Sequence, residues 1–135
     1  MTAALPAVSI ETFEAAQVDP DVFDHEAHVY TAWLYLERWP LDEALRRFCA
    51  AIKRLTIALG AESKYNETIS WFFMILIHER RQSGAAGCWH NFRHDNDDLV
   101  AGAGLLLKRY YRPQTLASEL ARHTFVLPDR FSETR

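Results

Sequence analysis

Apolar residues recur along most of the chain at spacings of three and four, which is the period of an α-helix. The clearest stripe lies in residues 41–59, where Arg46, Lys53 and Arg54 occupy the opposite, polar face. Residues 83–94 show no such period and are predicted to be irregular. Further helices are predicted over residues 9–16, 24–39, 63–82, 95–110 and 116–125. The pattern therefore predicts an all-α fold, a single-domain bundle of five to six helices.

Helix-capping and helix-breaking residues place the ends of these segments. Ser9, Asp24 and Ser63 are predicted N-caps, because their side-chain oxygens can accept from free backbone N–H groups. Pro40 separates the second helix from the third, and Gly60 ends the third. Residues 1–8 and 129–135 are expected to be flexible tails of this one domain.

One segment is ambiguous between a strand and a helix. Residues 71–77 are apolar without interruption, and a short apolar run suits a buried element of either kind. A helix is favoured because the flanking helical pattern is long and no partner strand occurs elsewhere.

Composition narrows the class of protein. The chain has 135 residues, of which 49% are hydrophobic and 24% charged, as in ordinary globular domains. Its net charge of −3 is spread along the chain, so neither nucleic acid nor a membrane surface is an expected partner. The longest apolar run is too short to span a bilayer. Two isolated cysteines, Cys49 and Cys88, and the lack of a signal-peptide pattern favour a cytoplasmic location.

The first candidate site is a pair of histidines at the start of the second helix. His25 and His28 are three residues apart, so on a helix they share one face. Imidazole is a common ligand of transition metals, and such a pair is a natural half-site for a divalent metal. The alternative is that both histidines only cap or solvate the helix start.

A second polar cluster begins the helix predicted over residues 63–82. Asn66 and Ser70 are four residues apart and share a face, while Tyr65 and Glu67 lie beside them. Glu67 is a candidate third metal ligand or base, although a carboxylate in this position also suits the helix dipole.

Aromatic residues near these clusters are candidate walls of a ligand pocket. Tyr30, Trp33, Tyr65 and Trp71 lie within a few helical turns of the polar residues. The alternative is that they are ordinary core residues, as aromatic residues of helical bundles usually are. The remaining histidines are expected at the surface, and these are His78, His90, His94 and His123.

Several motifs resemble a family of small bacterial proteins of uncharacterised function. The family pattern runs Phe-x-His-x-x-His-x-x-x-Ala-Trp-x-Tyr-Leu, then Lys-Tyr-His-Glu-Thr-Ile-Thr, then Tyr-Tyr, and ends in Ala-Arg-x-x-Phe-x-x-Pro-Asp. The matching positions span nearly the whole chain and are Phe23, His25, His28, residues 32–36, residues 64–70, Tyr110, Tyr111, Ala121, Arg122, Phe125, Pro128 and Asp129.

This resemblance implies a site of three histidines, with the third in the second motif. Here Asn66 stands at that third position, and an amide is a much weaker ligand for zinc or iron than imidazole. Ser70 replaces the threonine of the pattern and keeps its hydroxyl. Three readings follow: Glu67 or another histidine completes the metal shell, the site binds an organic molecule, or the site is silent.

The leading hypothesis is a protein that binds a divalent metal or a small molecule, with enzymatic activity left open. In a metal-dependent enzyme, His25, His28 and Glu67 would be the ligands or acid–base groups, and Asn66 and Ser70 would orient the substrate. The alternative is a non-catalytic helical subunit, either a homodimer or an accessory partner of a biosynthetic enzyme.

Overall fold

The computed structural model describes residues 5–84 and 87–130, and all regular secondary structure within them is helical. The predicted all-α fold is therefore confirmed. Five of the helices have seven residues or more, and the others are short. The α-helices are α1 (Ile10–Glu14), α2 (His25–Arg38), α3 (Leu41–Ala58), α4 (Glu67–Ser83), α5 (Trp89–Asp95), α6 (Asp97–Val100), α7 (Ala103–Tyr110), α8 (Pro113–Leu116) and α9 (Glu119–His123), with a 3-10 turn, η1 (Glu62–Lys64), before α4.

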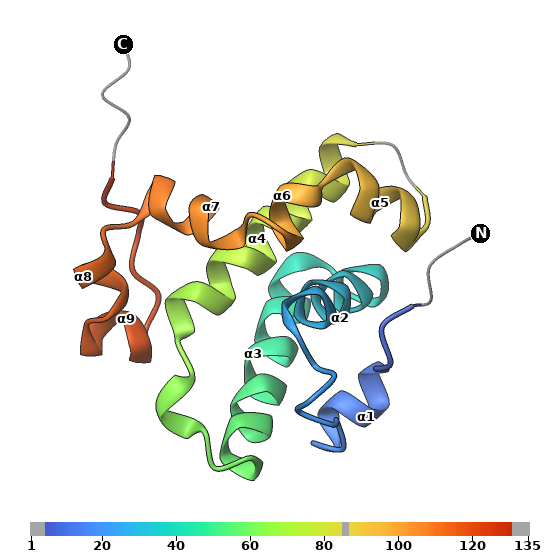
Figure 1. Ribbon diagram of the computed structural model, residues 1–135, viewed down its shortest axis with the longest axis horizontal. Helices are drawn as coiled ribbons and strands as arrows, with labels where there is room; N and C mark the ends of the chain where they lie inside the picture. The colour runs from blue at the N-terminus through green and yellow to red at the C-terminus, as the bar shows by residue number, and fades with distance from the viewer. Residues whose placement is uncertain (1–4, 85–86, 131–135) are drawn as a thin grey trace.

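The three longest helices, α2, α3 and α4, pack against one another and form the centre of the molecule (Figure 1). The short helix α1 covers α2 and α3, and α6 packs on α2. In Figure 1, α8 and α9 lie at the opposite end of the molecule from α1. Within the described ranges, no helix is both long enough and apolar enough to cross a membrane.

An aromatic cluster fills the space between α1, α2 and α3. The fully buried ring of Phe13 stacks on Phe48 and meets the edge of Tyr35, with centroid distances of 5.4 and 6.0 Å. Phe23 adds a third ring 5.6 Å from Phe13. Such offset and edge-on aromatic contacts stabilise a core beyond the apolar area that they bury. This cluster fixes the start of α2, where the histidines lie.

The predicted starts of the first two helices agree with the structure. The Ser9 side chain accepts from the Thr12 backbone N–H, and the Asp24 side chain accepts from the Ala27 N–H. The third helix runs from residue 41 as expected, and Gly60 follows its end with a φ of 68°, a left-handed conformation that suits glycine.

The start of α4 differs from the prediction, because Asn66 and not Ser63 is the N-cap. Ser63 lies inside the 3-10 turn η1, and Tyr65 is extended between that turn and the helix. The Asn66 side chain accepts from the Ile69 N–H at 3.0 Å. Asn66 therefore has a structural role that its place in the motif does not reveal.

The region after α4 also differs from the prediction. A two-turn helix, α5, lies among the residues expected to be irregular. It brings the rings of Trp89 and Phe92 together, with centroids 6.0 Å apart. The helix expected over 95–110 is divided at Gly102 into α6 and α7, because glycine is a poor helix former. The last predicted helix, 116–125, is likewise divided, with Ser118 as the N-cap of α9.

Four side chains attach the C-terminal segment to α4 and α7, and we call them the C-terminal clamp: Asn66, Thr68, Tyr111 and Asp129. Asp129 accepts from the Arg112 backbone N–H at 3.0 Å and from the Thr115 hydroxyl. The tail predicted to begin at residue 129 is therefore anchored at its first residue. Residues 1–4 and 131–135, which complete the two predicted tails, lie outside the described residues.

Candidate functional site

A pocket of about 670 Å³ lies between α2, α3 and α4. Its walls are mainly apolar: α3 contributes Ile52 and Leu55, and α4 contributes Phe73, Met74 and Ile77. This volume is within the usual range for small-molecule sites, which combine apolar walls with a few polar groups. The pocket is therefore large enough to enclose an organic ligand.

Five of the residues predicted for the site line this one pocket, which brings together the starts of α2 and α4. They are His25, His28, Tyr65, Asn66 and Ser70. The helical spacing within each motif placed His25 beside His28 and Asn66 beside Ser70, and the packing of α2 on α4 brings the two pairs together.

His25 is held in place by a contact to a distant part of the chain. Its Nε2 lies 2.9 Å from the backbone carbonyl oxygen of Leu99, which is part of α6. Because a carbonyl oxygen only accepts, this nitrogen carries the proton and donates it. The edge of the ring also meets Phe73, with centroids 5.4 Å apart. His25 thus joins the start of α2 to α6 and has only Nδ1 left for another partner.

His28 is a polar residue of the pocket that has no hydrogen-bond partner among the described residues. Its ring lies against Phe23, with centroids 4.3 Å apart, and 6.5 Å from the ring of His25. None of the described residues forms a hydrogen bond with it. Burial lowers the pKa of His28 to about 4, and the nearby His25 lowers it further while Asp24 opposes the shift. At neutral pH His28 is an uncharged imidazole facing an apolar pocket.

Asn66 and Tyr65 contribute to the pocket wall, but their polar groups are largely engaged elsewhere. Besides capping α4, the Asn66 amide donates to the Leu116 carbonyl oxygen at 2.8 Å. The Tyr65 hydroxyl is partly buried and donates to Glu67. Burial is the main cause that raises the pKa of Tyr65, and the hydrogen bond to Glu67 is the second. The Ser70 hydroxyl lies close enough to the Tyr65 hydroxyl to act on the pKa of Tyr65 in the lowering direction, although no hydrogen bond of 3.5 Å or less joins Ser70 to the described residues.

Glu67 and Trp71 lie in a polar network beside the pocket and do not line it. The Glu67 carboxylate accepts from the Tyr65 hydroxyl and from the Trp71 indole N–H, the latter at 2.9 Å. Lys53 on α3 forms an ion pair with it at 3.5 Å. The Trp71 ring stacks on Phe125 with centroids 4.9 Å apart. The sequence-predicted roles of Glu67 and Trp71 at the pocket therefore lack support from their positions.

Tyr30 and Trp33 lie on another face of α2 and do not reach the pocket. Both rings pack edge-on against the buried Trp89, at centroid distances of 5.1 and 5.8 Å. The Arg81 guanidinium lies 5.7 Å from the Trp33 ring. These two aromatic residues join α2 to α5. This position fits the alternative stated for them in the sequence analysis, that of ordinary core residues.

Two aromatic residues that sequence reasoning did not assign to the site cover it. Phe23 contacts His28, and Phe73 contacts His25. Phe23 opens the Phe-x-His-x-x-His pattern, but the sequence does not show that its ring contacts His28, and Phe73 lies in an apolar run that does not separate it from core positions. Lys64 also lines the pocket and is exposed to solvent.

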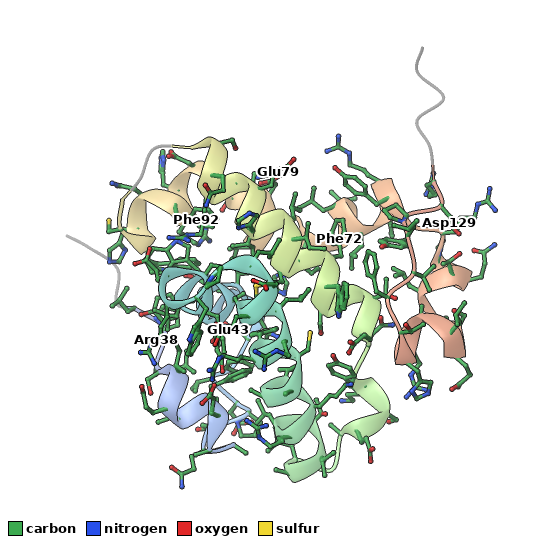
Figure 2. The ribbon with its side chains drawn as sticks, turned by 180° about the vertical axis from the view of Figure 1, so that it is seen from behind. Arg38, Glu43, Phe72, Glu79, Phe92 and Asp129 are labelled. Carbon is green, nitrogen blue, oxygen red and sulfur yellow. The ribbon has the colours of Figure 1, made fainter. Side chains whose placement is uncertain are left out.

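The other histidines do not join the site. His94 pairs with Asp95, and His123 with Glu119, and both histidines are exposed. His78 lines a separate groove of about 640 Å³ with Phe72 and Tyr110, between α4 and the end of α7. Figure 2 labels Phe72 where α4 approaches α7. Across residues 5–84 and 87–130, no three His, Cys, Asp or Glu side chains gather as a metal site would require.

Comparison of the chain with models of protein families, with curated proteins and with solved structures gave no match. Evidence for the function of the protein therefore comes from the geometry of its pocket.

Proposed function

We propose that this protein binds a small, largely apolar organic molecule in the pocket between α2, α3 and α4, with His28 as its polar anchor. The observation that carries this proposal is the imidazole of His28, which faces the apolar pocket without a hydrogen-bond partner among the described residues. The His28 ring is only partly buried, and in the part of the chain that the structure describes no fully buried side-chain nitrogen or oxygen lacks a partner, so the nitrogens of His28 reach the open part of the pocket, where solvent or a ligand is their hydrogen-bond partner. A ligand that bonds with His28 supplies that partner.

The geometry favours an organic ligand over a divalent metal. Structural and catalytic zinc sites use at least three protein ligands, and the third candidate, Glu67, binds Tyr65 and Trp71 outside the pocket. The Nε2 atom of His25 is also occupied by the Leu99 carbonyl group. The two histidines thus provide too few ligands for a metal ion, but they form a suitable polar end for an apolar cavity.

The same arrangement limits the chemistry that the pocket would perform. A general base works best when its pKa lies near the working pH. The pKa of His28 is lowered to about 4, so its imidazole is unprotonated but only weakly basic at neutral pH, and it suits hydrogen bonding to a ligand better than proton abstraction.

The test uses N-phenyl-1-naphthylamine, a neutral apolar dye whose fluorescence rises on leaving water. We expect the wild-type protein to bind it and Ser70→Phe to weaken binding at least about tenfold, because the added ring occupies the pocket. Ser83→Phe is the matched control, since Ser83 lies on the same helix but lines the separate groove beside Tyr110. Melting temperatures of both variants verify that each is folded.

Two results would contradict the proposal. The first is a wild-type protein that binds no dye. The second is binding that Ser83→Phe abolishes and Ser70→Phe leaves unchanged, because the dye would then occupy the other groove.

A further inference from the structure

The distribution of charge around the pocket limits which ligands it accepts. The charged residues of its lining are Asp24 and Lys64, and both are exposed to solvent. The walls beyond them are built from apolar side chains of α2, α3 and α4, such as Val29, Ile52 and Ile77. A charged group carried into this part of the pocket would lose its hydration without gaining a counter-ion, at a large cost in free energy.

The hydrogen-bonding groups of the pocket point to the same conclusion. A neutral imidazole offers one N–H donor and one bare nitrogen as acceptor, and a serine hydroxyl offers both functions as well. A ligand group that both donates and accepts can therefore use both functions that His28 and Ser70 offer. A carboxylate only accepts and an ammonium group only donates, whereas a hydroxyl group does both.

We infer that the ligand is an alcohol or a phenol, an apolar molecule whose single neutral hydroxyl group binds at His28. This inference rests on the proposed function, since it names the chemical class of the molecule bound in the same pocket. The ligand hydroxyl donates to the bare nitrogen of His28 and accepts from a neighbouring donor. Its hydrocarbon part lies against Ile52, Leu55 and Ile77.

The experiment compares 1-octanol with octanoate, which share a chain length and differ in the polar end. Their affinities are measured at neutral pH by displacement of the naphthylamine dye. We expect 1-octanol to bind at least about tenfold more tightly, because octanoate must bury an unpaired charge. In His28→Phe the affinity for 1-octanol should fall at least about threefold relative to that for the dye, because the hydroxyl group of 1-octanol loses its partner, whereas the cost of burying the charge of octanoate remains.

Two further variants keep the test decisive. His28→Gln retains a donor and an acceptor and should preserve the affinity for 1-octanol even if the phenylalanine variant is poorly folded. His123→Phe changes an exposed histidine on α9 and should leave both affinities unchanged.

The contrary outcomes separate the inference from the proposed function. Octanoate that binds as tightly as 1-octanol would overturn the inference and leave the pocket as a binding site. The same holds if octanoate binds more tightly than 1-octanol and loses this advantage in Lys64→Gln. An affinity for 1-octanol that is unchanged in His28→Phe would overturn the role of His28. Dye that is not bound at all would instead refute the proposed function.

Discussion

The pocket and the C-terminal clamp both depend on polar side chains of α4, but they use them in opposite ways. In the clamp, the fully buried Thr68 hydroxyl donates toward the Ala121 and Thr124 carbonyl oxygens at 2.8 and 2.9 Å. It also accepts from the Val126 N–H at 3.1 Å. Two residues further along the helix, Ser70 faces the pocket and has no such partner within the described residues.

This difference separates structural polar residues from those available to a ligand. A side chain whose hydrogen bonds all go to the backbone fixes a segment in place, as Thr68 and Asn66 do for residues 116–126. A side chain left without partners at an apolar cavity, such as His28, has its bonding capacity free for a bound molecule. Position in a motif does not distinguish the two, because Asn66, Thr68 and Ser70 lie in the same one.

The clamp draws its residues from three segments that lie far apart in the sequence. Thr68 comes from the motif at the start of α4, Tyr111 from the Tyr-Tyr pair, and Asp129 from the final Pro-Asp. The Tyr111 hydroxyl donates to the Val126 carbonyl oxygen at 2.6 Å, and Asp129 accepts from the Arg112 N–H. Residues far apart in the sequence thus hold one C-terminal segment.

Thr68→Val should produce the largest loss of stability among the changes that test this comparison. It keeps the shape of the side chain but leaves the Ala121 and Thr124 carbonyl groups and the Val126 N–H without their partner. We expect a loss of about 3 kcal/mol in the free energy of unfolding, measured by urea denaturation. Hydrogen exchange should accelerate in residues 116–128 before it does in α2 and α3.

Thr31→Val is the control for that change. Thr31 is also fully buried, but its hydroxyl donates to the Ala27 carbonyl oxygen of its own helix at 2.7 Å. That carbonyl group retains a helical partner, so we expect a loss below about 1 kcal/mol and no change in C-terminal exchange. Equal effects of the two valine variants would show that the clamp does not hold the segment.

Acidification should destabilise the protein through His28. The folded protein holds the pKa of His28 at about 4, below its ordinary value of 6.5, so the unfolded chain binds the proton first as the pH falls. This contribution to stability is complete above pH 6.5 and is lost between pH 6.5 and 4, amounting to about 3 kcal/mol. Urea denaturation at several pH values measures it.

His28→Phe isolates that contribution, because every other titrating group is shared with the wild-type protein. The variant should show a shallower fall in stability over the same pH range. Parallel pH profiles for the two proteins would mean that His28 is charged or solvated in the folded state.

Ser70→Ala should have the smallest effect on stability. Its hydroxyl makes no hydrogen bond of ordinary length within the described residues, and alanine is the better helix former. We expect the free energy of unfolding to stay unchanged or rise by up to about 0.5 kcal/mol. A loss of more than about 1 kcal/mol by thermal or urea denaturation would place Ser70 with Thr68 among the structural residues.

The sequence predicts the fold well where the helical signals are local. Ser9 and Asp24 mark helix starts through their own side chains, and the stripe over residues 41–59 identifies the face of α3 that is buried. The start of α4 is not predicted correctly, because it depends on a contact with a distant segment, whereas the division at Gly102 follows a local signal, the poor helix propensity of glycine. Asn66 is favoured over Ser63 as a cap by its second bond, to the Leu116 carbonyl group 50 residues away.

The candidate site is predictable only in part, for a reason that lies in α2. This helix is apolar around nearly its whole circumference, so its sequence does not show which face meets α4 and which meets α5. His25 and His28 share the first face, whereas Tyr30 and Trp33 lie on the second and pack on Trp89. Glu67 is similarly adjacent to Asn66 in sequence, but one residue along a helix rotates its side chain out of the pocket.

The central claim is that His28 is a neutral imidazole available to a ligand, and NMR of its ring nitrogens tests this most directly. With ¹⁵N-labelled histidine, assigned by comparison with His28→Phe, the account predicts no protonation of His28 at neutral pH. It also predicts a change in the His28 nitrogen shifts when 1-octanol is added, with those of His123 unaffected. A His28 ring that titrates near its ordinary pKa of 6.5 and does not respond to 1-octanol would contradict the account.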